Sequence, residues 1–75
     1  MKNSPEIEKP LGDAVRAHRV ANGWSQEELS FESGLHRTYI GAVERGEKNL
    51  TVKNLVRISV ALGVPASVLL ASVGL

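Results

Sequence analysis

Residues 34–46, GLHRTYIGAVERG, bring together side chains that could read the bases of DNA from one short helix. The guanidinium of Arg37 carries parallel donors that match the O6 and N7 acceptors of guanine, and Thr38 offers a hydroxyl and a methyl group. Ala42 could touch a thymine methyl, and Gly41 would let the helix backbone approach the DNA closely. A glycine inside a helix costs about 1 kcal/mol relative to alanine, so Gly41 calls for such a reason. We therefore expect base contacts from Arg37, Thr38, Gly41 and Ala42.

Neighbouring residues are suited to contact the phosphates. Helix N-termini present free N–H groups and a positive dipole end, which favour anions. Gln26 lies in the first turn of one expected helix, and Lys48 and Asn49 precede another. Arg45 lies on the outward face of the helix over 36–45. Tyr39 has two interpretations: its hydroxyl reaches a phosphate, or its ring lies against the edge of the core.

Two short helices must position these side chains. Ser25 and Glu28 form the capping box SQEE, and Trp24 and Leu29 occupy the positions of a hydrophobic staple, so a helix is expected to start at Ser25. Gly34 allows the left-handed turn that ends it. The next helix runs from about residue 36 to 45 and is closed by Gly46. Two such helices joined by a tight glycine turn cross steeply and share a small core.

The rest of the chain predicts three more helices and no strand. One runs from about Leu11 to Asn22 and is followed by Gly23. Another is capped by Thr51 and ends at Gly63, and the last follows Pro65. The helix capped by Thr51 is expected to bury Val52, Leu55, Ile58 and Leu62. The prediction is one all-α domain over residues 11–75, preceded by a flexible arm over residues 1–10.

Composition limits the classes of function. The chain has 75 residues, a net charge of +1 and no cysteine, which suits the cytoplasm. Two histidines without cysteine make a metal site improbable, and no nucleophile–base pair, small-molecule pocket or cofactor motif is evident, so we expect no enzyme. Residues 58–75 lack charge, but Gly63, Pro65 and three serines argue against a membrane span.

The apolar end of the chain has two interpretations. Val68, Leu69, Leu70, Val73 and Leu75 lie within eight residues. They either complete the core of the monomer or form an interface between two copies. Five apolar residues exceed what one short helix can bury beneath itself, which favours a homodimer interface formed by Val68, Leu69 and Val73. A symmetric dimer would set two recognition helices about one DNA turn apart.

The segments SQEELSFESGLHRTYIGAVERG and NLTVKNLVRISVALGV closely resemble the helix-turn-helix domain of the phage Cro and CI repressor class, the XRE-type regulators. The resemblance covers about residues 11–64. It implies a compact five-helix domain like that of the lambda repressor, which binds operator DNA, usually as a symmetric dimer. It also implies phosphate contact by Gln26 and an internal ion pair between Arg19 and Glu44.

The chain departs from the family pattern at a few positions. His18, Ser30 and Ser33 replace apolar or small residues, and His36 stands where a serine or threonine cap is common. A weaker cap is therefore expected at the start of the helix over 36–45. In its small size the chain resembles the controller proteins of restriction–modification systems. An antitoxin-like module that binds a partner protein through the last helix is the alternative. We expect no exposed aromatic residues suited to stacking on unpaired bases, which disfavours an RNA binder.

Overall fold

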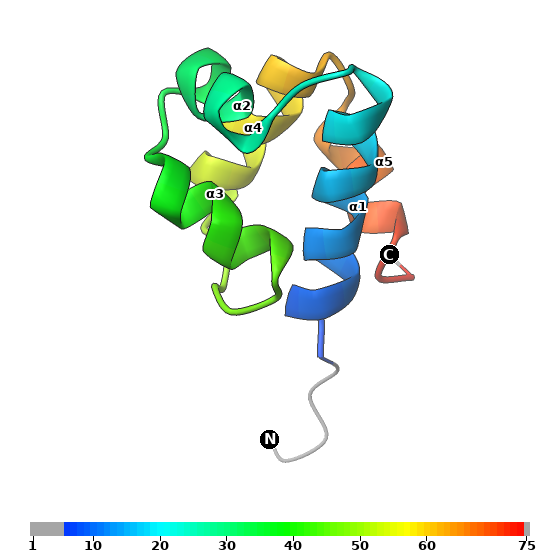
Figure 1. Ribbon diagram of the computed structural model, residues 1–75. Coiled ribbons are helices and arrows are strands. Elements are labelled where there is room, and N and C mark those ends of the chain that lie inside the picture. The colour runs from blue at the N-terminus through cyan, green and yellow to red at the C-terminus, as the bar shows by residue number, and fades with distance from the viewer. Residues whose placement is uncertain (1–5, 75) are drawn as a thin grey trace.

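The computed structural model describes residues 6–74, and this part of the chain forms five helices and no strand. They are α1 (Glu8–Ala21), α2 (Gln26–Ser33), α3 (Arg37–Glu44), α4 (Val52–Leu62) and α5 (Ala66–Ala71). In Figure 1, α2 and α3 form one side of the molecule, α1 stands on the other, and α4 and α5 lie behind them. The predicted all-α, five-helix fold is confirmed.

Local capping chemistry defines the start of α2 and of α4 as predicted. The Ser25 hydroxyl accepts from the N–H of Glu28 at 3.0 Å, and the Glu28 carboxylate accepts from the N–H of Ser25 at 2.8 Å. The hydroxyl of Thr51 accepts from the N–H of Asn54 at 3.1 Å. Gly34 ends α2 in the left-handed conformation, with φ of 73°. These bonds satisfy N–H groups that the first turn of a helix leaves without a partner.

The first helix begins earlier than the sequence predicts. It starts at Glu8 rather than near Leu11, so residues 8–10 of the expected arm are helical. Pro10 is tolerated there because the first N–H groups of a helix have no intrahelical acceptor. The first bond of the helix joins the Leu11 N–H to the Ile7 carbonyl at 3.0 Å. Residues 6 and 7 precede the helix, and residues 1–5 of the expected arm lie outside the described residues.

All five helices meet around one apolar core. Its buried members are Leu11, Val15, Leu29, Ile40, Val43, Leu55, Ile58, Leu62 and Leu69. The expectation that Val52 belongs to this set is wrong, because its side chain is 78% exposed. The buried arc of α4 is centred on Leu55, Ile58 and Leu62. Val52 instead shares the neighbouring arc with Val56 and Val60, four and eight residues further on.

The last helix belongs to the monomer. Leu69 is 0% exposed, since α5 packs against both α1 and α4. Because two neighbouring helices cover α5, this short helix buries more apolar side chains than it would against a single helix. Val73 is half-buried against the core, while Val68 remains 41% exposed. The prediction that Leu69 contributes to a dimer interface is therefore wrong. None of the described helices has the length and apolarity needed to cross a membrane.

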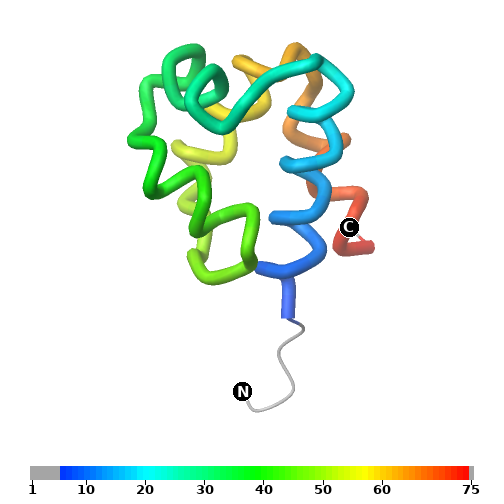
Figure 2. The backbone as a smooth tube through the Cα atoms, in the orientation of Figure 1, coloured from blue at the N-terminus to red at the C-terminus, as the bar shows by residue number. Residues whose placement is uncertain are grey.

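A glycine in α1 sets the distance between α1 and α3. A Cβ at Gly12 would lie 2.1 Å from the carbonyl oxygen of Val43, so the two backbones are in direct contact at this point. Just beyond α3, a Cβ at Gly46 would lie 2.9 Å from the Cα of Lys9. Figure 2 shows this approach, where the turn after α3 passes the start of α1. The end of α3 is thus held tightly against the first helix.

Replacing Gly12 with alanine tests this packing. The added methyl group would overlap rigid backbone, and overpacking of this kind costs about 1–3 kcal/mol or more in the free energy of unfolding. Urea unfolding followed by circular dichroism measures the loss. The matched control is Gly41→Ala, whose Cβ would approach only side-chain atoms, the nearest at 3.1 Å. A Gly12→Ala variant as stable as the parent would contradict the account of this contact.

Candidate nucleic-acid interface

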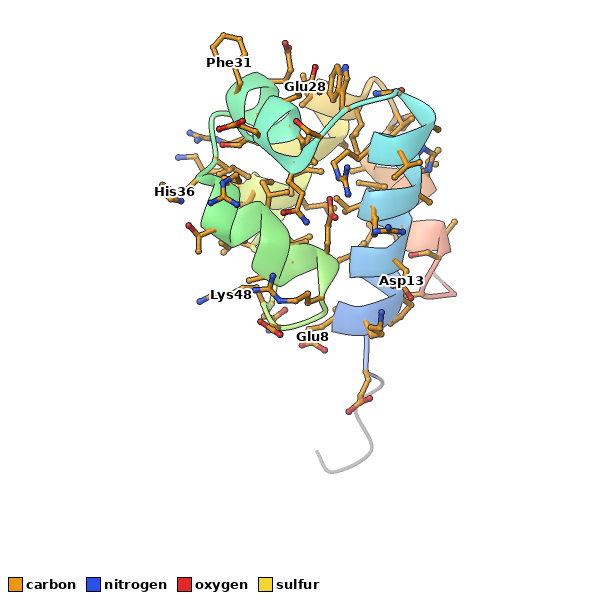
Figure 3. The ribbon with its side chains drawn as sticks, in the orientation of Figure 1. Glu8, Asp13, Glu28, Phe31, His36 and Lys48 are labelled. Carbon is orange, nitrogen blue, oxygen red and sulfur yellow. The ribbon has the colours of Figure 1, made fainter. Side chains whose placement is uncertain are left out.

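The exposed face of α3 begins with a capped turn. His36 precedes the helix, and its Nδ1 accepts from the N–H of Thr38 at 3.1 Å and lies 2.7 Å from the Thr38 hydroxyl. An imidazole nitrogen here takes the place of a serine or threonine oxygen, so α3 has a side-chain cap, and the expectation that this cap is weaker stays a prediction. Arg37 and Thr38 are both exposed. Figure 3 shows His36 at the outer end of this helix, away from α1.

The other two residues expected at the bases are largely buried. Gly41 is buried, and a Cβ built there would lie 3.1 Å from Nη1 of Arg45 and 3.4 Å from Oε1 of Gln26. The bare backbone is therefore covered by two polar side chains rather than left open. Ala42 is only 9% exposed. It lines a surface hollow together with His36, Thr38, Tyr39, Arg45 and Lys48.

A buried ion pair holds α3 to the rest of the molecule. Arg19 of α1 donates from Nε to Oε2 of Glu44 at 2.6 Å and from Nη2 to Oε1 at 2.9 Å. Its Nη1 donates to the carbonyl of Trp24 at 2.7 Å. The Glu44 side chain is 2% exposed and that of Arg19 11%. The hydrogen bond with Glu44 raises the pKa of Arg19 above its ordinary value, so the arginine stays charged.

Gln26 joins this pair. It occupies the first position of α2, and its Nε2 donates to Oε1 of Glu44 at 3.1 Å. One carboxylate oxygen thus accepts from Arg19 and from Gln26. The structure brings together three residues that the sequence places in α1, α2 and α3, and it adds the Trp24 carbonyl, which no side-chain pattern could indicate.

The remaining candidate phosphate contacts are Tyr39, in the first turn of α3, and three residues at and after the end of that helix. Lys48 and Asn49 are exposed in the segment between α3 and α4. Arg45 is exposed, and its Nε lies 3.1 Å from Oε2 of Glu47, which raises the pKa of Arg45. Tyr39 is half-buried and packs against the core, while its hydroxyl accepts from Nδ2 of Asn54 at 3.1 Å. The interpretation that the ring of Tyr39 lies against the core is confirmed, and the contact of its hydroxyl with a phosphate stays a prediction.

Comparison of the sequence with known protein families identifies the family of this chain. Residues 15–69 match the model of a family described as helix-turn-helix. The chain belongs to this family. Its members of the XRE type are DNA-binding transcription regulators, so the resemblance seen in the sequence is confirmed.

Several relatives of this helix-turn-helix regulator are named control or controller proteins. Control protein C.SmaI of Serratia marcescens is 46% identical over 70 residues, which are 93% of this chain and 83% of that protein. Control protein C.BamHI of Bacillus amyloliquefaciens is 49% identical over 55 residues, 72% of this chain and 68% of that one. The crystal structure of the restriction–modification controller protein C.AhdI from Aeromonas hydrophila is 42% identical and superposes with a TM-score of 0.79. That match covers 80% of this chain and 91% of the other.

Two functional neighbours of the site were not expected from the sequence. Asn54 fixes the hydroxyl of Tyr39, and Glu47 pairs with Arg45. The signal for Glu47 is only its charge two residues after Arg45, and Asn54 carries no distinctive signal because its partner is fifteen residues away. Within residues 6–74 of this helix-turn-helix regulator, no group of three or more histidines or acidic residues could hold a metal ion.

The cap at His36 makes a testable contribution to stability. Removing an N-cap acceptor typically costs about 0.5–2 kcal/mol in the free energy of unfolding, so His36→Ala should lose an amount in this range. His36→Asn should recover most of it, because asparagine is among the best capping residues. Denaturant unfolding measures both variants. Equal stability of His36→Ala and the parent would show that the imidazole does not cap α3.

Proposed function

We propose that this chain is a sequence-specific regulator that inserts α3 into the major groove of operator DNA. The observation that carries the proposal is the division of α3 between an apolar inner face, with Ile40 and Val43 fully buried, and an exposed first turn with Arg37 and Thr38. The major groove of B-DNA admits an α-helix, and arginine bound to guanine is the commonest specific contact. Arg37 is the main base-reading residue and Thr38 its neighbour.

Ala42 and Gly41 have different parts in this proposal. The Ala42 methyl group lines a hollow flanked by Arg45 and Lys48, which suits it to receive a thymine methyl group. Gly41 lies beneath Gln26 and Arg45, so it contributes to phosphate binding through the space that it leaves for these two side chains and makes no base contact of its own.

The phosphates of both strands are bound on either side of α3. Gln26 and the N–H groups of the first turn of α2 hold one strand, and Arg45, Lys48 and Asn49 hold the other. The hydroxyl of Tyr39, fixed by Asn54, can still donate to a phosphate oxygen because it accepts the bond from that amide. Binding of this kind positions the protein without reading sequence.

We further propose that the regulator acts in the cytoplasm as a controller of a restriction–modification system. The support is its similarity in sequence over most of its length to C.SmaI and C.BamHI, both named control proteins, and in fold to the controller C.AhdI. A controller of this kind switches genes, so the proposal requires an operator near such a system.

The regulator is proposed to bind a palindromic operator as a homodimer through α4 and α5. Val52, Val56 and Val60 form an apolar stripe on α4, exposed by 78%, 45% and 73%. Of the interface residues expected from the sequence, Val68 of α5 is exposed and Val73 is partly exposed. A twofold axis beside this stripe would bring its apolar side chains against those of a second copy and cover them.

Arg37→Ala tests base reading. Losing a bidentate contact should weaken binding to the consensus duplex by about 5- to 150-fold, which corresponds to about 1–3 kcal/mol, and should change binding to unrelated duplexes little. Fluorescence anisotropy with labelled duplexes measures both affinities. The matched control is Lys48→Ala, which should weaken both kinds of duplex alike and reduce the salt slope by about one. Equal losses on both duplexes for Arg37→Ala would refute its assignment.

Val60→Glu tests the dimer. A buried charge in the valine stripe should shift the protein to the monomer in sedimentation velocity, while the fold stays intact by circular dichroism. Val20→Glu is the control, since Val20 is an exposed valine of α1, 53% exposed, outside the stripe. If Val60→Glu sediments as the parent does, the stripe is not the interface.

A further inference from the structure

We propose that Glu44 is a positioning residue for DNA binding, which fixes the amide of Gln26 in one orientation before the DNA arrives. The inference rests on the phosphate contact proposed for Gln26. It assigns to the buried ion pair a part in binding besides its part in joining the helices.

The direction of the Gln26 amide follows from the chemistry of its partner. A carboxylate only accepts hydrogen bonds, so the side of the amide that faces Glu44 must be its nitrogen. The 3.1 Å bond from Nε2 to Oε1 uses one of the two N–H groups of that nitrogen. The opposite orientation would set the amide oxygen against the carboxylate oxygen and is excluded by repulsion.

The carboxylate itself cannot turn to follow Gln26. Both of its oxygens accept from Arg19, at 2.6 and 2.9 Å, and the side chain is 2% exposed. Arg19 is held in turn by the Trp24 carbonyl at 2.7 Å, two residues before Gln26. The acceptor for Gln26 is therefore a rigid part of the fold and not a surface side chain that rearranges freely.

Gly41 leaves room for the other end of the amide. Oε1 of Gln26 lies 3.4 Å from the position that a Cβ would occupy at Gly41, beside the guanidinium of Arg45. The amide thus lies between α3 and solvent with its oxygen over Gly41 and its nitrogen on Glu44. One N–H of that nitrogen and the N–H groups of the first turn of α2 other than that of Glu28, which the Ser25 hydroxyl binds, remain for a phosphate oxygen.

Holding a side chain in its bound rotamer removes an ordering cost from association. The expected gain in affinity is about two- to tenfold, which is the range for one flexible side chain. The gain should be the same for consensus and unrelated duplexes, since phosphate contacts carry no sequence information.

The test is a cycle of variants that leaves no unpaired charge. Arg19→Met combined with Glu44→Met replaces the ion pair by apolar side chains, an exchange that often leaves stability unchanged. The full chain with this pair of changes, Gln26→Ala, and all three changes together are compared with the parent by anisotropy on the duplex selected by the parent. We expect the loss of affinity caused by the Met pair to be two- to tenfold larger when Gln26 is present than when residue 26 is alanine.

An equal loss in the presence and absence of Gln26 would overturn the proposal, because the ion pair would then act only through the fold. A Gln26→Ala variant that binds as the parent does would overturn it as well. If the parent itself selects no duplex, the proposed function fails.

A second measurement needs no variant of the ion pair and no DNA. In the ¹⁵N–¹H spectrum of the free parent, assigned with Gln26→Ala, the side-chain amide proton of Gln26 that is bonded to Glu44 should be shifted from its free-glutamine position and protected from exchange with water. Resonances at the free-glutamine positions, with rapid exchange, would overturn the proposal even if the Met pair does not fold.

Discussion

The buried pair of Arg19 and Glu44 is the interaction on which the arrangement of α1, α2 and α3 depends. Arg19 comes from α1 and Glu44 from the end of α3, and the same arginine binds the carbonyl before α2. Such a pair adds little net stability over an apolar equivalent, but removing one partner costs about 3–5 kcal/mol because a buried charge remains. Its value here is geometric: it fixes how α3 and the start of α2 sit relative to each other, and both are proposed to contact DNA.

Two glycines make this geometry accessible in different ways. Gly12 lets the backbone of α1 touch that of α3 at the Val43 carbonyl, which brings Arg19 within reach of Glu44. Gly41 lets the side chains of Gln26 and Arg45 lie across α3. The helix-propensity cost of a glycine in α3 is therefore explained by packing of polar side chains above it. Close approach of its backbone to DNA is no longer needed as the reason.

The sequence predicts well what local chemistry decides. The capping box at Ser25, the turn at Gly34 and the cap at Thr51 each depend on residues within a few positions, and all three appear in the structure. Burial depends on distant helices, which explains the errors: α1 and α4 cover Leu69, and Val52 falls outside the buried arc of α4. The bond from Gln26 to Glu44 spans eighteen residues, and no spacing rule could indicate it. For the site, residue types were predictable but their mutual contacts were not.

The most direct test of the account is selection of the parent protein on a library of random DNA duplexes, repeated at two salt concentrations. Sequence reading by two copies of α3 predicts a palindromic consensus that persists at the higher salt, with half-sites about one helical turn apart. Phosphate attraction alone would enrich no sequence and would give an affinity that falls away as salt rises. That second result would contradict the claim that α3 reads bases.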